Sequence, residues 1–199
     1  MGLRYGPRVI SDGLILSLDA EDINSYPGSG NVWYDLSGLG INHSLVNSPT
    51  FNGDSFTLNG TNGFLFPGSL TNVSDCTVVL FYKTTDTQEL WVTIQSNGSY
   101  YLSAAYPGSG YYHSNVGSPI NYVDLNVVTD PIASGYKDGK YHMWEAKHVN
   151  FTGWTEFAWF TYGGGWQLNG TVAKIMIYNR ALTAEESKHN YNIFKTRFQ

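Results

Sequence analysis

The densest group of carboxylates in the chain is Asp19-Ala20-Glu21-Asp22. Hydrolysis of a glycosidic bond needs two carboxyl groups flanking that bond, about 5–5.5 Å apart for retention of configuration and about 6.5–9.5 Å apart for inversion. Asp19 and Glu21 would share one face if the strand before them continued through this segment. Glu145 and Glu156 each stand alone in the sequence. The chain therefore offers only one weak carboxylate pair for this chemistry.

Histidine and cysteine point to no second kind of catalysis. Of the five histidines, only His142 and His148 approach a metal-ligand spacing, and the simpler interpretation is that the histidines are solvated or hydrogen-bonded strand residues. Cys76 is the single cysteine and lies in an apolar run, which predicts a small buried hydrophobic residue. The motifs Gly-x-Ser-x-Gly and His-Glu-x-x-His and a phosphate-binding glycine loop are absent from the sequence.

Aromatic side chains next to amides form a candidate binding surface, because the C–H edges of a sugar pack on rings while its hydroxyl groups need polar partners. Trp154 and Trp166 are flanked by glycine and could stand exposed. The same residues could instead pack in the core, as strand tyrosines commonly do, or form a protein–protein interface, where Tyr and Trp are enriched. The candidate carbohydrate- or partner-binding residues are Tyr106, Tyr111, Tyr112, Asn115, Trp154 and Trp166.

Composition and charge narrow the class of protein. Aromatic residues make up 16% of the 199 residues and charged residues only 14%, against a usual charged fraction of about 25%. The formal charge is −5, and no cluster of Lys and Arg provides a footprint for nucleic acid. The N-terminus lacks the apolar run of a signal peptide, and no apolar stretch is long enough for a bilayer. We therefore expect neither a nucleic-acid nor a membrane partner.

Closely spaced turn signals and short β-branched or aromatic runs predict an all-β fold. Dipeptides such as Asp12-Gly13, Asn62-Gly63 and Asp138-Gly139 favour tight turns between strands. Many short strands with regular turns are typical of a sandwich, and no linker divides residues 1–199, so we expect a single domain. The predicted strands lie near 13–19, 55–59, 62–66, 76–84, 89–96, 99–106, 140–149, 155–161 and 171–179.

The C-terminus departs from this pattern and predicts one helix over about 184–196. Thr183 and Glu186 have the spacing of a capping box, in which each side chain accepts a hydrogen bond from the backbone of the other. Tyr191, Phe194 and Phe198 follow at helical spacing. We expect this aromatic stripe to face the sandwich.

The two ends of the chain resemble a known family. Residues 12–20, 33–38 and 55–60, the turn at 138–142 and the segment 170–186 are similar to the corresponding parts of concanavalin A-like, laminin-G-like jelly rolls. The resemblance implies a two-sheet antiparallel jelly-roll sandwich with a short helix after the last strand. Hydrolases of this superfamily commonly carry Glu-x-Asp-x-Glu on one strand, and this chain has no such run.

The same resemblance implies two further properties. Folds of this family often hold calcium at a sheet rim, which makes Asp19, Asp22 and Asp35 candidate ligands. The alternative is that Asp22 and Asp35 are turn residues whose carboxylates bond to nearby backbone N–H groups. Stand-alone domains of this form without a signal peptide also resemble structural proteins of tailed bacteriophages, which implies a position on a virion surface.

We therefore predict a non-enzymatic virion protein, a capsid decoration or tail component. It would contact other virion proteins or copies of itself and could also bind a cell-surface glycan. The first alternative is a free carbohydrate-binding lectin. The second is a glycoside hydrolase. Fold alone does not choose among them.

Overall fold

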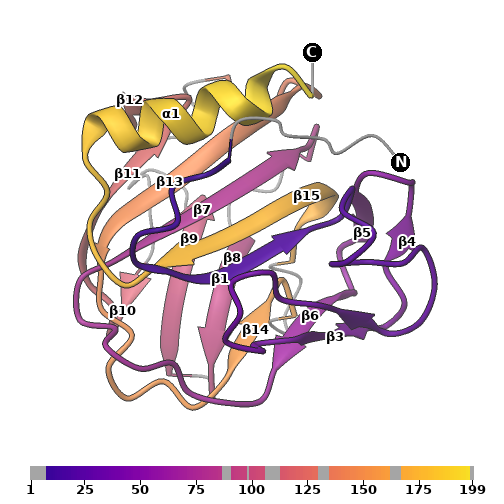
Figure 1. Cartoon of the computed structure of the whole chain (residues 1–199), viewed down its shortest axis with the longest axis horizontal. Coiled ribbons are helices and arrows are strands. Elements are labelled where there is room, and N and C mark those ends of the chain that lie inside the picture. The colour runs from indigo at the N-terminus through magenta and orange to yellow at the C-terminus, as the bar shows by residue number, and fades with distance from the viewer. Residues whose placement is uncertain are drawn as a thin grey trace.

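The described strands form two antiparallel sheets stacked face to face, and one helix lies over the outer side of one of them (Figure 1). The computed structural model describes residues 8–86, 91–97, 99–105, 113–129, 135–161 and 167–197. The prediction of an all-β, two-sheet antiparallel sandwich with a short C-terminal helix is confirmed.

The sheet beneath the helix, here called the helix-side sheet, has the strand order β12-β11-β13-β7-β15-β5-β4. β1 also pairs with β15, alongside the half of β15 that β5 leaves free. The strands of this sheet are β1 (Leu14–Asp19), β4 (Thr50–Phe51), β5 (Phe56–Asn59), β7 (Cys76–Lys83), β11 (Gly117–Val123), β12 (Asn126–Val127), β13 (Tyr141–Val149) and β15 (Asn169–Tyr178).

The opposite sheet, here called the far sheet, has the order β10-β9-β8-β14-β6-β3-β2. Its strands are β2 (Val32–Trp33), β3 (His43–Val46), β6 (Gly63–Phe66), β8 (Trp91–Ser96), β9 (Tyr100–Ala105), β10 (His113–Ser114) and β14 (Phe157–Trp159).

Each of the nine predicted strands overlaps a strand of the structure within a few residues. The sequence analysis missed β2, β3, β4, β10, β11 and β12. Four of these are only two residues long, too short for an alternating pattern to be visible. β11 was missed because it is a polar edge-side strand that contains a proline, which weakens the strand signal.

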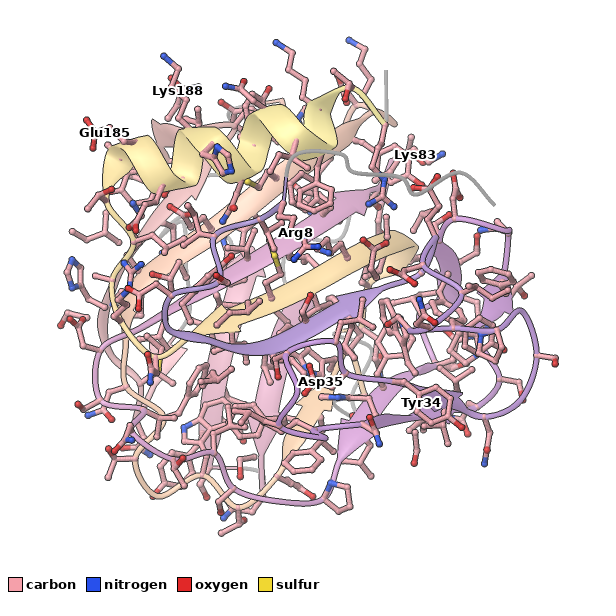
Figure 2. The ribbon with its side chains drawn as sticks, viewed as in Figure 1. Arg8, Tyr34, Asp35, Lys83, Glu185 and Lys188 are labelled. Carbon is pink, nitrogen blue, oxygen red and sulfur yellow. The ribbon has the colours of Figure 1, made fainter. Side chains whose placement is uncertain are left out.

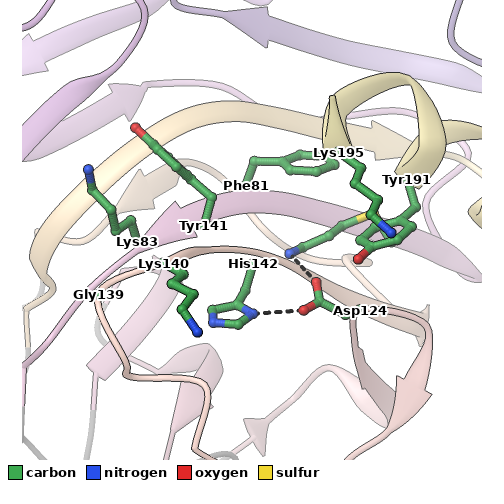
Figure 3. Close-up of a pocket in the computed structure, with 10 residues that line it drawn as sticks. Phe81, Lys83, Asp124, Gly139, Lys140, Tyr141, His142, Tyr191 and Lys195 are labelled. Carbon is green, nitrogen blue, oxygen red and sulfur yellow. Dashed lines mark hydrogen bonds and ion pairs between the residues drawn. The ribbon is translucent and has the colours of Figure 1, made fainter. Parts of the chain in front are cut away.

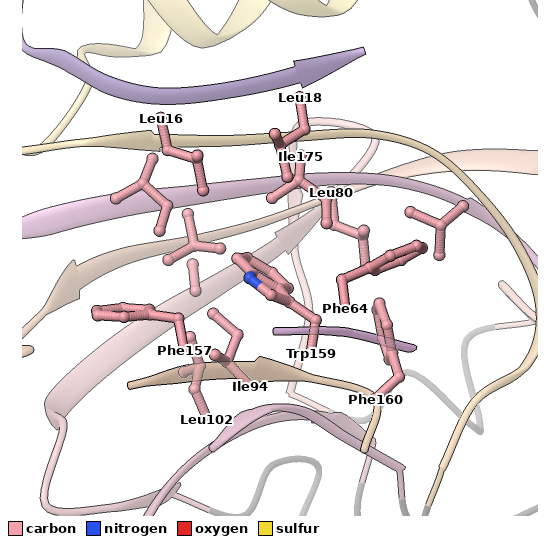
Figure 4. Close-up of a cluster of buried hydrophobic side chains, with 14 of the residues drawn as sticks. Leu16, Leu18, Phe64, Leu80, Ile94, Leu102, Phe157, Trp159, Phe160 and Ile175 are labelled. Carbon is pink, nitrogen blue, oxygen red and sulfur yellow. The ribbon is translucent and has the colours of Figure 1, made fainter. Parts of the chain in front are cut away.

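The interior between the sheets is filled mainly by large apolar side chains (Figure 4). Leu16, Leu80 and Ile175 of the helix-side sheet face Phe64 and Trp159 of the far sheet. Each of these five side chains is at most 1% exposed. Burying one such side chain contributes about 1.5–3 kcal/mol, so this layer dominates the stability of the sandwich.

The helix-side sheet is buried on both faces at its centre. In β7, Val78 and Leu80 belong to the interior, whereas Val79 and Phe81 contact the cluster under the helix. A strand covered on both faces has apolar residues at consecutive positions instead of at alternate ones. This explains the continuous run after Cys76, whose own side chain is fully buried as predicted. Burial raises the pKa of the Cys76 thiol to about 12.

The covering helix is α1 (Ala184–Lys195), and it begins as predicted. Thr183 accepts from the Glu186 backbone N–H, and the Glu186 carboxylate accepts from the Thr183 N–H. Phe194 is 3% exposed and packs on Phe81, which confirms its inward position; Tyr191 is half-buried, and Phe198 lies outside the described residues. Among the described residues, no helix has the length and apolar character needed to span a bilayer.

One buried histidine, His43 of β3, accepts a hydrogen bond from Trp159 of β14 within the far sheet. Trp159 donates its indole N–H to His43 Nε2 at 3.0 Å, so the His43 proton is on Nδ1 and points to the Ile41 carbonyl at 3.0 Å. His43 is fully buried, and this burial lowers its pKa from 6.5 to about 4. His43 therefore stays neutral in the folded protein at neutral pH.

We expect this neutral histidine to make the fold acid-sensitive. As the pH falls from 6.5 to 4, the unfolded chain takes up a proton that folded His43 does not, so stability is lost by about 3 kcal/mol. His43→Gln keeps an acceptor for the indole N–H and should remove this part of the pH dependence. Urea unfolding followed by tryptophan fluorescence measures it. Equal losses for wild type and variant over this pH range would contradict the assignment.

Candidate functional site

The tyrosine-rich segment predicted as a binding surface falls mostly outside the described part of the chain. Tyr106, Tyr111, Tyr112 and Trp166 lie outside the described residues. Asn115 is described and exposed, and its side-chain amide donates to the Ser99 carbonyl at 2.9 Å. The binding role of this segment stays a prediction.

Trp154 does not stand exposed, and of the alternatives left open by the sequence it takes core packing, which rules out its binding role. Its side chain is 2% exposed and lies against Phe151 and Phe157, with ring centroids 4.8 and 5.3 Å away. A turn closed by the Trp154 N–H and the Phe151 carbonyl folds the ring back into the core. The adjacent glycine serves this turn, with a φ of 85°, and the apolar area of the indole decides where the ring goes.

Asp35, one of the predicted calcium ligands, organises the loop after β2 (Figure 2). Its carboxylate accepts from the Ser17 N–H at 2.9 Å, from the Ser37 N–H and hydroxyl at 2.9 and 2.6 Å, and from the Ile41 N–H at 3.2 Å. This matches the alternative in which Asp35 bonds to backbone N–H groups. Its oxygens are already engaged by protein donors.

Asp19, the second predicted ligand, lies in a buried ion-pair network. Lys174 contacts its carboxylate at 2.9 Å, and Arg197 binds both of its oxygens at 2.9 Å. Burial alone would raise the pKa of Asp19, but the hydrogen bonds and charges of Arg197 and Lys174 outweigh it and hold that pKa well below 3.8. Arg197 also contacts Glu21 at 2.5 Å, so this guanidinium occupies the space that a hydrolytic pair would need.

Asp22, the third, accepts from the backbone and side-chain N–H groups of Asn24, both at 2.9 Å. Asp19, Asp22 and Asp35 therefore each have separate protein partners. Across the described ranges, no three His, Cys, Asp or Glu side chains are grouped so that they could hold a metal ion.

A different site stands out in the structure: a cleft of about 570 Å³ between the ends of β7 and β13 and the last turns of α1 (Figure 3). Its apolar lining includes Phe81 and Met143, which are paired across the two strands and nearly fully buried. Tyr141 from β13 and Tyr191 from α1 add half-buried rings. A volume of this size is within the range of ligand sites, about 300–1,000 Å³.

Two lysines lie over these rings. Lys83 and Tyr141 are cross-strand partners on β7 and β13, and the Lys83 ammonium lies 4.8 Å from the centre of the Tyr141 ring. Lys195 is four residues after Tyr191 on the helix, and its ammonium lies 5.6 Å from that ring. Each tyrosine therefore has a cation at its face.

His142 is held between two carboxylates at the edge of the cleft. Its Nδ1 lies 2.7 Å from Asp124 Oδ2, and its Nε2 lies 3.0 Å from Asp138 Oδ1. Carboxylates accept hydrogen bonds, so both ring nitrogens donate when the imidazole is charged. Burial disfavours that charge, but the hydrogen bonds and charges of Asp124 and Asp138 outweigh it and raise the pKa of His142 above 6.5.

A second, polar groove of about 440 Å³ adjoins the cleft and shares Lys83 and Gly139 with it. Thr84 lies in this groove and donates its hydroxyl to the Asn169 carbonyl at 2.6 Å. Lys83 therefore lies where the apolar cleft meets a groove lined by hydroxyl groups, an amide and the Asp86 carboxylate.

Sequence reasoning did not find this cleft. It noted His142 only with His148, but a bulge re-aims His148, which has a φ of 62° and contacts Asp75 instead. The cleft depends on a strand register and on where α1 ends, and no short motif encodes either. The one signal in the sequence is the strand period at residues 141–147, which places Tyr141 and Met143 on one face of the predicted strand.

Comparisons with known proteins give structures of similar fold. A sialidase of Trypanosoma rangeli in complex with sialic acid is 14% identical with a TM-score of 0.57, over 92% of this chain and 33% of that one. A second structure is domain 4 of the GH43 extracellular arabinanase AbnA of Geobacillus stearothermophilus, in complex with arabinotriose. It is 16% identical with a TM-score of 0.57, and the match covers 87% of this chain and 95% of that one. The receptor-binding domain of botulinum neurotoxin C/D mosaic serotype is 14% identical with a TM-score of 0.54, and the match covers 92% of this chain and 52% of that one.

At these identities the likeness shows the fold alone. This chain spans about a third of the length of the sialidases. No protein-family model and no curated protein sequence matches the chain. The comparisons confirm a β-sandwich of the jelly-roll kind.

The buried network around Asp19 gives a test of the calcium prediction. Asp19→Asn would leave the Lys174 ammonium, 4% exposed, without its anion, which should lower the free energy of unfolding by about 3–5 kcal/mol. The control Asp22→Asn alters a partly exposed carboxylate that makes no ion pair with Lys174 and should change stability by no more than about 1 kcal/mol. We expect millimolar calcium to leave the wild-type Tm unchanged. A calcium-dependent rise in Tm that is lost in both variants would support the calcium site instead.

The position of His142 predicts its titration. An NMR pH titration should give a midpoint above 6.5, and Asp138→Asn should lower it because one partner charge is removed. Since the folded pKa is raised, the stabilisation is present below pH 6.5 and is lost as the pH rises through the folded pKa. Asp75→Asn, at the exposed His148 pair, is the control and should leave the His142 midpoint unchanged. A midpoint at or below 6.5 would show that the two carboxylates do not hold the charged ring.

Proposed function

We propose that this protein is a non-catalytic binding module that takes a carbohydrate in the cleft between β7, β13 and α1. The observation that carries the proposal is the pairing of Tyr141 and Tyr191 with polar groups around one apolar-lined cleft. Ring faces can pack on the C–H edges of a sugar. The ammonium groups beside them and the adjoining polar groove can bond to its hydroxyls.

The state of the carboxylates supports binding over hydrolysis. Asp124 and Asp138 lie on either side of the cleft edge, but the His142 imidazole lies between them and contacts both. A glycosidic bond or a nucleophilic water would need that same space. Asp19 and Glu21 are likewise bridged by Arg197.

The size of the chain is also consistent with a binding module. The arabinanase domain that was solved with arabinotriose is matched over 95% of its length, so a unit of this size and fold exists there as a separable ligand-bearing domain. Arabinotriose is the ligand of the arabinanase domain, and it supports a carbohydrate ligand for this chain by analogy only.

The cleft is tested by glycan-array screening followed by calorimetry on the best saccharide. Tyr191→Leu keeps apolar contact with the sheet but removes the ring, and the loss of one ring contact, about 1 kcal/mol, should weaken binding about fivefold. The matched control Tyr34→Leu removes a tyrosine that is 44% exposed on the loop after β2. It should leave the Kd unchanged.

Three results would count against the proposal. A chain that binds no saccharide on the array is not a carbohydrate module. A Kd that responds to Tyr34→Leu but not to Tyr191→Leu would move the site elsewhere. Release of reducing ends from the bound polysaccharide, at a rate that falls in Glu21→Gln, would favour the hydrolase.

We also propose, from the sequence resemblance, that the module sits on the surface of a phage-like particle and contacts virion proteins or copies of itself. Gene neighbourhood tests this setting, since flanking capsid, portal or tail genes would support it. A stable self-assembled oligomer without any array signal would favour the structural role over the free lectin.

A further inference from the structure

Positive charge gathers around the cleft of a chain whose formal charge is −5. Lys83, Lys140 and Lys195 line it together with the His142 ring, and its acidic lining residue is Asp124, with Asp138 next to it. Among the described residues, three ammonium groups and one imidazolium thus line the cleft with two carboxylates, which is an excess of two positive charges when His142 is protonated. The Asp86 carboxylate lines the adjoining groove.

The two carboxylates are already used within the protein. Asp124 accepts from the His142 ring at 2.7 Å and from the Met143 N–H at 2.9 Å. Asp138 accepts from His142 at 3.0 Å and from the Lys140 N–H at 2.9 Å, and the Lys140 ammonium lies 3.1 Å away. Hydrogen bonds from His142 and Lys140 accordingly hold the pKa of Asp138 well below its ordinary value. Both carboxylates are therefore paired with His142 or Lys140, and neither is paired with Lys83 or Lys195.

Lys83 and Lys195 are in a different situation. Among the described residues, neither ammonium forms an ion pair with a carboxylate, and the contact described for each is the face of a tyrosine ring. The position of Lys195 in the last turn of α1 is favourable for the helix dipole, but no such effect applies to Lys83 at the end of a strand. In Figure 3 the two lysines stand at opposite ends of the cleft, with Tyr141 and Phe81 between them and Tyr191 beside Lys195.

We propose that the carbohydrate taken by this cleft is anionic, an oligosaccharide with carboxylate or sulfate groups on more than one ring. This inference rests on the proposed function and names its ligand class. The rings contact the sugar faces, and Lys83 and Lys195 contact negative groups at the two ends. Lys83 also borders the polar groove, but Asp86 lines that groove, so the negative groups of the ligand are expected in the cleft and only uncharged hydroxyls over Thr84.

Calorimetry with oligogalacturonate and with its methyl ester tests the charge requirement, because the two have the same sugar backbone. A sulfated dextran oligosaccharide, with neutral dextran as its partner, distinguishes sulfate from carboxylate. We expect at least one anionic probe to bind about tenfold more tightly than its neutral partner at low ionic strength. We also expect the advantage to shrink as salt is added.

Lys83→Met and Lys195→Met test the placement, since methionine keeps an apolar stem and removes the charge. Each should weaken binding of the anionic probe about fivefold and binding of the neutral partner by a smaller factor, because a neutral sugar loses only a hydroxyl contact. Lys188→Met is the matched control, because it makes the same change of charge at an exposed position of the same helix (Figure 2). It should change the Kd less than twofold.

The outcomes separate this inference from the proposed function. Neutral and anionic saccharides that bind equally, with loss in Tyr191→Leu, would overturn the anionic preference and keep the carbohydrate module. Equal weakening by all three lysine variants would reduce the effect to net charge and overturn the assignment to Lys83 and Lys195. Binding of inorganic polyphosphate with no binding of any saccharide would overturn both proposals.

Discussion

The structure depends on the burial of the helix-side sheet on both of its faces. Its central strands β7 and β15 lie over the aromatic interior on one side and under α1 on the other. A sheet in this position gains apolar burial twice, but every polar side chain on its outer face must find a partner under the helix. On α1 these partners are polar residues, Ser187 and Asn190, which face the sheet together with the aromatic Phe194.

Polar and charged groups form a connected layer between sheet and helix. Glu145 is 1% exposed, accepts from the Ser187 hydroxyl at 3.0 Å and lies 3.2 Å from the Lys147 ammonium. Lys147 in turn donates to the Leu182 carbonyl at 2.8 Å, just before the helix begins. Asn190 donates to the Tyr178 hydroxyl at 3.0 Å. A pair of buried charges adds little net stability, yet leaving one partner alone is costly. Moving α1 along the sheet would break these pairs and leave buried charges without partners. The layer therefore fixes where α1 lies.

The sequence predicts the sandwich, the long strands and the helix start because each has a local cause. Alternation along β13, turn dipeptides such as Asp12-Gly13 and the capping box at Thr183 are properties of a few neighbouring residues. The sequence does not predict that Ser187 and Asn190 face the sheet, since their polarity suggests solvent and only their buried partners explain them. Trp154 shows the same limit. Its neighbouring glycine is compatible with an exposed or a buried ring, and only the structure shows that this glycine provides the turn that returns the ring to the core.

The place of the cleft follows from the same covering arrangement. A helix of 12 residues is about 18 Å long, whereas a strand of ten residues such as β15 extends about 33 Å. α1 therefore covers only part of the outer face, and the apolar face continues past its end at Phe81 and Met143. Beneath the helix, charges are paired and fixed, and the His142 cluster continues this rigid layer to the cleft edge. Beyond the helix, Lys83 and Lys195 keep long flexible stems over the rings. A rigid apolar lining loses little order when the proposed ligand binds, whereas fixing the two lysine stems costs about 0.5–1.5 kcal/mol each, which the ring and charge contacts must outweigh.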